Sequence, residues 1–179
     1  MLTKRKDSNA PERPKMYANA LAGDALDVET WVDQMIAENG YAQLSIHDPN
    51  SGRPGCAFTL GLEHSRQSPE LFCMGVSPEI ASTLFSLCIE AHDAARVDLA
   101  SARGDMSDLI EGFVVRLRRI PPALACQGQA ARSDRCFDIT ALVQILMPDN
   151  AGRFPGDPSC DPLVAAAQDA DRLITGTAN

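Results

Sequence analysis

Apolar residues recur at helical spacing in two stretches of the chain. The first stripe consists of Val28, Trp31, Val32, Met35 and Ile36. Gly40 follows it and suits a helix end. A second stripe, over 80–95, begins just after Ser77 and Pro78, which suit the N-cap and first turn of a helix. These patterns predict two helices, of which the second is the longer.

Other stretches alternate apolar and polar residues, or are apolar throughout, and these predict strands. Five such stretches lie at 41–47, 56–62, 70–76, 112–120 and 141–147. The stretch at 70–76 is apolar on both faces, which is typical of a central strand. Residues 98–111 show no sustained period and predict a loop with a helical turn, while 161–174 predict a closing helix.

This element order favours an α+β fold with a mainly antiparallel sheet, one long helix and flanking shorter helices. Residues 1–24 hold two prolines and few large apolar side chains, so they predict a flexible tail. Residues 25–175 are then expected to form a single globular domain, because a chain of 179 residues has the length of one domain.

Charge and hydropathy limit the classes of partner. The formal net charge is −8, and an acidic body repels a phosphate backbone, so nucleic acid is not an expected partner. No secretory h-region and no run of 18 or more apolar residues occurs in the sequence. A cytoplasmic protein without membrane contact is expected, and its six cysteines are then expected to be reduced thiols.

Motifs for common chemistry are missing. The sequence contains no CxxC pair, no G-x-S-x-G elbow and no glycine-rich nucleotide loop, so no catalytic residue and no cofactor is assigned. Weak metal-ligand candidates are His47, Glu63 and His64, whose spacing does not require a metal site. Their alternative role is that of exposed or capping side chains.

Two segments carry polar residues at positions that need an explanation. Glu70 directly precedes a buried strand and therefore needs a partner, which is either local backbone or a functional group near Thr59. In "PDNAGRFPG" the turn formers hold Arg153 next to Asp149. Arg153 is expected either to pair with Asp149 or Glu70, or to reach a ligand carboxylate or phosphate.

The same segments resemble a known family. "AFTLGL" (57–62), "SPEL" (68–71) and "QILMPDNAGRFPG" (144–156) are similar to motifs of the bacterial domain of unknown function 4262 family. The resemblance implies a stand-alone bacterial cytosolic domain of open activity. The matched residues with polar chemistry are Thr59, Glu70, Gln144, Asp149 and Arg153.

Three classes of function follow as hypotheses. The first is a small-ligand- or partner-binding domain with a polar site built from the three motif segments, in which Arg153 is reachable from solvent. The second is a metal- or carboxylate-dependent hydrolase or transferase, which needs Glu63, His64 or His47 to converge with Glu70 or Asp149. The third is a protein-interaction module, for example a homodimer. The sequence assigns no particular ligand or partner.

Overall fold

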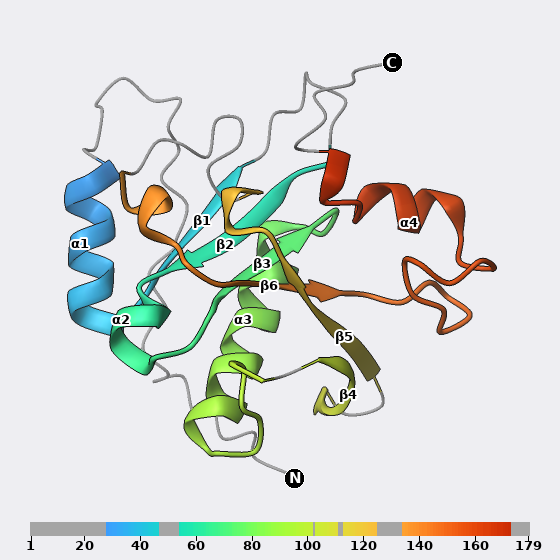
Figure 1. Ribbon diagram of the computed structural model, residues 1–179, viewed down its shortest axis with the longest axis horizontal. Coiled ribbons are helices and arrows are strands. Elements are labelled where there is room, and N and C mark those ends of the chain that lie inside the picture. The colour runs from blue at the N-terminus through green and yellow to red at the C-terminus, as the bar shows by residue number, and fades with distance from the viewer. Residues whose placement is uncertain (1–27, 47–53, 102, 111–112, 125–133, 173–179) are drawn as a thin grey trace, which may run out of the picture.

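A computed structural model describes residues 28–46, 54–101, 103–110, 113–124 and 134–172 (Figure 1). The predicted tail 1–24 and His47 lie outside these residues, and the boundaries of the single domain stay a prediction. The described elements are α1 (Val28–Asn39), β1 (Ala42–Ile46), β2 (Cys56–Leu60), α2 (Leu62–Arg66), β3 (Glu70–Met74), α3 (Pro78–Asp93), β4 (Gly104–Ile110), β5 (Phe113–Ile120), the 3-10 turns η1 (Pro122–Leu124) and η3 (Asp134–Asp138), β6 (Leu142–Leu146) and α4 (Pro162–Ala167).

The six described strands form one mixed sheet in the order β1-β2-β3-β6-β5-β4. Its two central strands, β3 and β6, are parallel, whereas their outer neighbours pair antiparallel. The fold class α+β is confirmed, but the expectation of a mainly antiparallel sheet is wrong. The chain leaves β3 through α3 and the β4–β5 hairpin before β6 returns beside β3, and a crossover of this length permits parallel pairing.

Local sequence explains where the helices begin and end. The Ser77 side chain accepts a hydrogen bond from the backbone N–H of Ile80 at 3.3 Å, and Pro78 occupies the first turn of α3. Gly40 takes a φ of 80° just after α1. A single long helix is not shown: α3 has 16 residues and α1 has 12.

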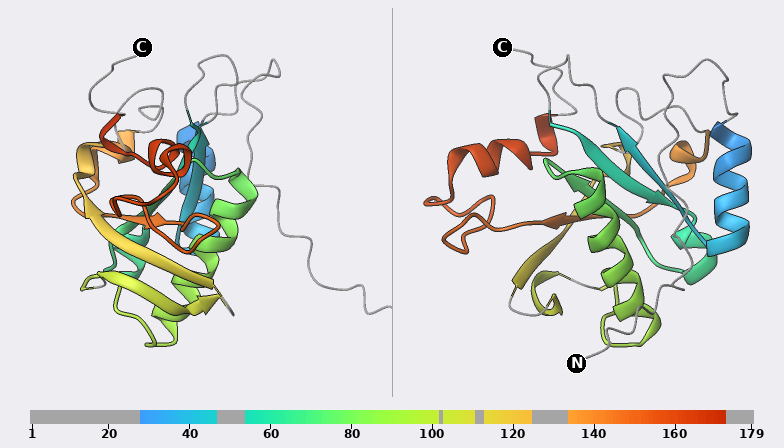
Figure 2. Two further views of the ribbon diagram at one scale, coloured as in Figure 1. Left: turned by 90° about the vertical axis from the view of Figure 1, so that its right-hand side faces the viewer. Right: turned by 180° about the vertical axis from the view of Figure 1, so that it is seen from behind.

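The two faces of the sheet are covered by different helices. α3 lies across one face and packs Leu84, Phe85 and Cys88 against the apolar side chains of the central strands (Figure 2). On the other face, Val32 and Met35 of α1 pack with Phe58, Phe72 and further apolar residues of β2 and β3. Burial on both faces explains why β3 and β6 read as continuous apolar runs.

Strand β4 occupies residues for which the sequence predicts a loop. Among the described strands it is an edge strand and pairs with β5 alone, and its register shifts between Met106 and Ile110. A strand held from one side and interrupted by an irregularity does not need a regular apolar period. Within the described residues, no helix combines the length and the apolar character needed to cross a membrane.

Candidate functional site

Glu70 lies at the start of β3, where its buried carboxylate joins three segments. Its Oε1 accepts hydrogen bonds from the backbone N–H groups of Gly61 at 2.7 Å and Glu63 at 3.2 Å. Its Oε2 accepts from the Thr59 hydroxyl at 2.7 Å, and that hydroxyl accepts from the Leu71 N–H at 2.8 Å. This Glu70 cluster, formed by Thr59, Gly61, Glu63 and Glu70, therefore closes the corner between β2, α2 and β3.

Burial raises the pKa of Glu70, and the hydrogen bonds from Thr59, Glu63 and Gly61 oppose that shift. The nearby Glu63 carboxylate is also engaged with backbone. It accepts from the Ala141 N–H at 2.7 Å and from both the N–H and the hydroxyl of Thr140 at 2.9 Å. Both carboxylates thus fasten the starts of β3 and β6 through hydrogen bonds to the backbone.

Asp149 organises the loop that follows β6. Its Oδ1 accepts from the backbone N–H groups of Ala151 at 2.8 Å and Arg153 at 2.9 Å. Its Oδ2 accepts from Nε and Nη2 of Arg153, both at 2.9 Å, and from the Asp161 N–H at 3.0 Å. The backbone N–H of Asp149 also donates to the Arg153 carbonyl at 2.8 Å. We call Asp149, Ala151, Arg153 and Asp161 the Asp149 loop network.

The electrostatics of this network favour an ionised Asp149. The Arg153 N–H, with further help from the Asp161 and Ala151 N–H groups and the Arg153 charge, lowers the pKa of Asp149 to about 2. The Asp149 side chain is 2% exposed, whereas that of Arg153 is 43% exposed. The network therefore buries the Asp149 carboxylate and leaves the Arg153 side chain partly exposed to solvent.

Phe154 anchors the same loop to the sheet. The ring is buried, and the guanidinium of Arg116 on β5 stacks over it with 4.3 Å between its carbon and the ring centroid. The Phe154 N–H donates to the Asp157 carboxylate at 2.9 Å, and Arg116 contacts that carboxylate at 3.4 Å. These contacts fasten the loop after β6 to β5.

Gln144 lies in the middle of β6, and its side chain bonds to residues outside the Glu70 cluster and the Asp149 loop network. Its Nε2 donates to the Gln168 carbonyl at 2.8 Å, and its Oε1 accepts from Nε of Arg118 at 2.9 Å. The Gln168 side chain in turn accepts from the Met147 N–H at 2.7 Å and donates to the Met147 carbonyl at 2.9 Å. These bonds fasten the segment after α4 to β6.

The structure does not bring the five candidate residues into one site. Glu70 is paired with Leu142 in the parallel β3–β6 register, so Thr59 and Glu70 lie where β6 begins. Asp149 and Arg153 lie beyond the other end of β6, towards α4, while α2 marks the Glu70 end (Figure 1). Gln144 lies between the two. Local sequence does not predict Arg118 and Gln168 as partners of Gln144, because their contacts depend on the β5–β6 pairing and on the return of the chain after α4. Nor does it predict Leu163, whose 80% exposure on α4 follows from how that helix packs.

The metal-ligand candidates are also separated. His64 is exposed on α2, the Glu63 carboxylate binds Thr140 and Ala141, and His47 lies outside the described residues. Among the side chains that the structure describes, no three His, Cys, Asp or Glu residues are grouped as a metal site would need.

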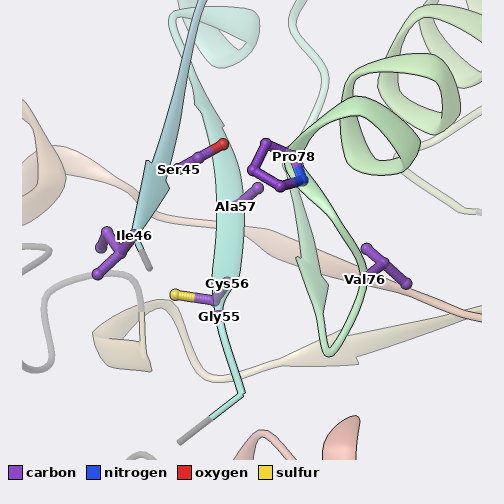
Figure 3. Close-up of a pocket in the computed structure, with 7 residues that line it drawn as sticks. All are labelled: Ser45, Ile46, Gly55, Cys56, Ala57, Val76 and Pro78. Atoms are coloured by element: carbon purple, nitrogen blue, oxygen red, sulfur yellow. The ribbon is translucent and has the colours of Figure 1, made fainter. Parts of the chain in front are cut away.

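A hollow lies beside the start of α3 (Figure 3). It is lined by Ser45, Ile46, Gly55, Cys56, Ala57, Val76 and Pro78, and contains none of the candidate residues. Burial raises the pKa of its Cys56 thiol to about 11, so this thiol is protonated at neutral pH and is a poor nucleophile.

Gly75, the residue after β3, lies close to the backbone of Ala167 in α4. Its φ is +72°, and an added Cβ would lie 2.5 Å from the backbone oxygen of Ala167. We expect Gly75→Ala to lower the free energy of unfolding by about 2 kcal/mol, because positive φ and a backbone clash act together. Urea unfolding measures this change. The matched control is Gly152→Ala, at φ +77° with open space around it, which should cost about 1 kcal/mol from backbone strain alone. Equal losses for the two variants would contradict the clash.

The fold is a mixed-sheet α+β fold, and its motif residues lie in three separate hydrogen-bonded groups around Glu70, Gln144 and Asp149. The model of the family described as Domain of unknown function (DUF4262) matches residues 35–161. The chain belongs to this family. No curated protein and no solved structure matches it.

Proposed function

We propose that this chain is a partner-binding domain that contacts a protein through Arg153 and Leu163. The observation that carries the proposal is the exposure of both side chains beside a buried acid. Arg153 is 43% exposed although Asp149 holds it, and Leu163 is 80% exposed on α4. Arginine is enriched at protein interfaces, and covering an exposed leucine removes apolar area from water.

The Asp149 loop network supports both contact residues at once. Asp149 Oδ2 accepts from the Arg153 side chain and from the Asp161 N–H, and the Asp161 side chain caps α4 by accepting from the Leu163 N–H at 2.8 Å. Two contact residues ten positions apart in sequence are thus tied to one carboxylate. Preorganisation of this kind lowers the entropy lost when a partner binds.

The chemistry of Arg153 indicates what the partner presents. Its Nε and Nη2 face Asp149, and Nη1 has no partner among the described residues. A guanidinium edge of this kind binds carboxylates well. We therefore propose an acidic side chain or chain terminus on the partner, next to an apolar side chain that covers Leu163.

A partner protein accounts for this surface better than a small ligand does. Small-molecule sites are concave and enclose most of the ligand. The hollow of Figure 3 lies at the start of α3 and shares no residue with the Asp149 loop network. The hydrolase or transferase hypothesis gains no support from the carboxylates of Glu63 and Glu70, since both bind local backbone.

Photo-crosslinking in the native host tests the proposal. A photoreactive benzoylphenylalanine at position 163 is expected to yield an adduct of defined mass. The same group at position 80 should yield none, although Ile80 is 46% exposed on α3. Arg153→Glu should reduce the position-163 adduct at least tenfold, because a charge-assisted contact becomes a repulsion.

The mass of the position-163 adduct identifies the kind of partner. An adduct of twice the chain mass identifies a second copy as the partner, and light scattering at several concentrations would then confirm a homodimer. Equal adducts from positions 80 and 163, or a position-163 adduct that Arg153→Glu leaves unchanged, would contradict the proposal. Arg96→Glu is the control for the charge change, because Arg96 is an exposed arginine on the loop after α3.

A further inference from the structure

Arg118 is a half-buried arginine without an acidic partner among the described residues. It lies on β5 directly opposite Gln144 of β6. Its Nε donates to Gln144 Oε1 at 2.9 Å, which leaves Nη1 and Nη2 without a described partner. A partly desolvated cation bonded only to a neutral amide lacks the counter-charge that such groups usually have.

Gln144 holds Arg118 in a fixed orientation. The Gln144 side chain is fully buried, and its Nε2 is committed to the Gln168 carbonyl. Since one end of the amide must donate to that carbonyl, the other end presents Oε1 to Arg118. Gln168 is itself fixed by its two bonds to the backbone of Met147. The Nη1–Nη2 edge of Arg118 is therefore preorganised.

The charges around Arg118 leave it unneutralised. On the same face of β5, Arg116 forms ion pairs with Asp105 and Asp157. No ion pair joins Arg118 to any carboxylate of the described residues. Arg118 is therefore the arginine on this face of β5 whose charge is left without a described counter-charge.

We propose that Arg118 binds an oxyanion, the carboxylate or phosphate group of a small molecule, end-on through Nη1 and Nη2. The planar edge of a guanidinium matches two oxygens of either group. This site uses neither of the two residues of the proposed partner surface, Arg153 and Leu163.

Titration of the full chain, labelled with ¹⁵N-arginine, tests the site. Inorganic phosphate and acetate are the probes, each added at constant ionic strength with chloride as the balancing anion. The Nε–Hε resonance of Arg118 is expected to shift saturably, with a Kd in roughly the millimolar range. The probe with the lower Kd shows whether the site prefers a phosphate or a carboxylate group. The resonance of Arg96, an exposed arginine with no described side-chain partner, should not saturate.

Variants separate a site from general charge screening. Arg118→Gln should weaken binding at least tenfold, and Arg96→Gln should leave it unchanged. If Arg118→Gln does not fold, the wild-type titration still tests the site through the difference between the Arg118 and Arg96 shifts. Absence of a saturable Arg118 shift with both probes, or equal shifts at Arg96 and Arg118, would overturn the proposal.

Discussion

Glu70→Ala is expected to lower the free energy of unfolding by about 3 kcal/mol. The substitution removes the acceptor of three donors, the N–H groups of Gly61 and Glu63 and the hydroxyl of Thr59. Water has little access to this corner, since Thr59 and Glu70 are both almost fully buried. Chemical denaturation followed by circular dichroism measures the loss.

Glu70→Gln is the matched control for Glu70→Ala. The glutamine carbonyl can keep the two N–H donors, and only the contact with the Thr59 hydroxyl must rearrange, so the loss should be about 1 kcal/mol. Because burial raises the pKa of Glu70, ionisation of this group opposes folding as the pH rises above the usual range of glutamate. Glutamine avoids that cost. Similar losses for alanine and glutamine would show that Glu70 does not brace this corner.

Features encoded by adjacent residues could be predicted from the sequence. The start of α3 depends on Ser77 and Pro78, and the end of α1 depends on Gly40, so each needs only a few neighbouring residues. The central position of β3 was also predictable, because burial on both faces leaves an apolar run. The parallel pairing of β3 with β6 was not, since it depends on the path of about 70 intervening residues.

The candidate site was predicted in part for the same reason. Asp149 and Arg153 are four residues apart within a turn-rich loop, so their pairing follows from local sequence. The contact of Glu70 with Thr59 follows from the neighbouring strands β2 and β3. That these two pairs lie at opposite ends of β6 follows only from the sheet order, which local patterns do not contain.

The family motifs therefore mark two places where the chain must turn sharply after or before a central strand. At each place a buried carboxylate collects several backbone N–H groups that would otherwise be unsatisfied. Glu70 does this before β3, and Asp149 does it after β6. In the second network the charged side chain of Arg153 is 43% exposed and Nη1 has no partner among the described residues, which is why we place the partner surface there.

Asp149→Asn is expected to lower Tm at pH 7 by about 5–10 °C, because it removes a buried charge that accepts hydrogen bonds from Ala151, Arg153 and Asp161. The effect should depend on pH in a definite direction. The pKa of Asp149 is lowered from 3.8 to about 2 in the folded chain. Its ionisation therefore stabilises the fold fully above pH 3.8, and that stabilisation is lost as the pH falls towards about 2.

The Tm difference between wild type and Asp149→Asn should thus be constant near neutral pH and shrink as the pH falls from about 4 to 2. Asp98 and Asp105 also have lowered pKa values, but both proteins contain them, so their contributions cancel in the difference. Asp105→Asn serves as the control, because its ion pair with Arg116 is exposed and should change Tm by less than about 2 °C. A Tm difference that stays the same from pH 7 to pH 2 would show that the charge of Asp149 does not hold the loop, and the preorganisation of Arg153 and Leu163 would need another cause.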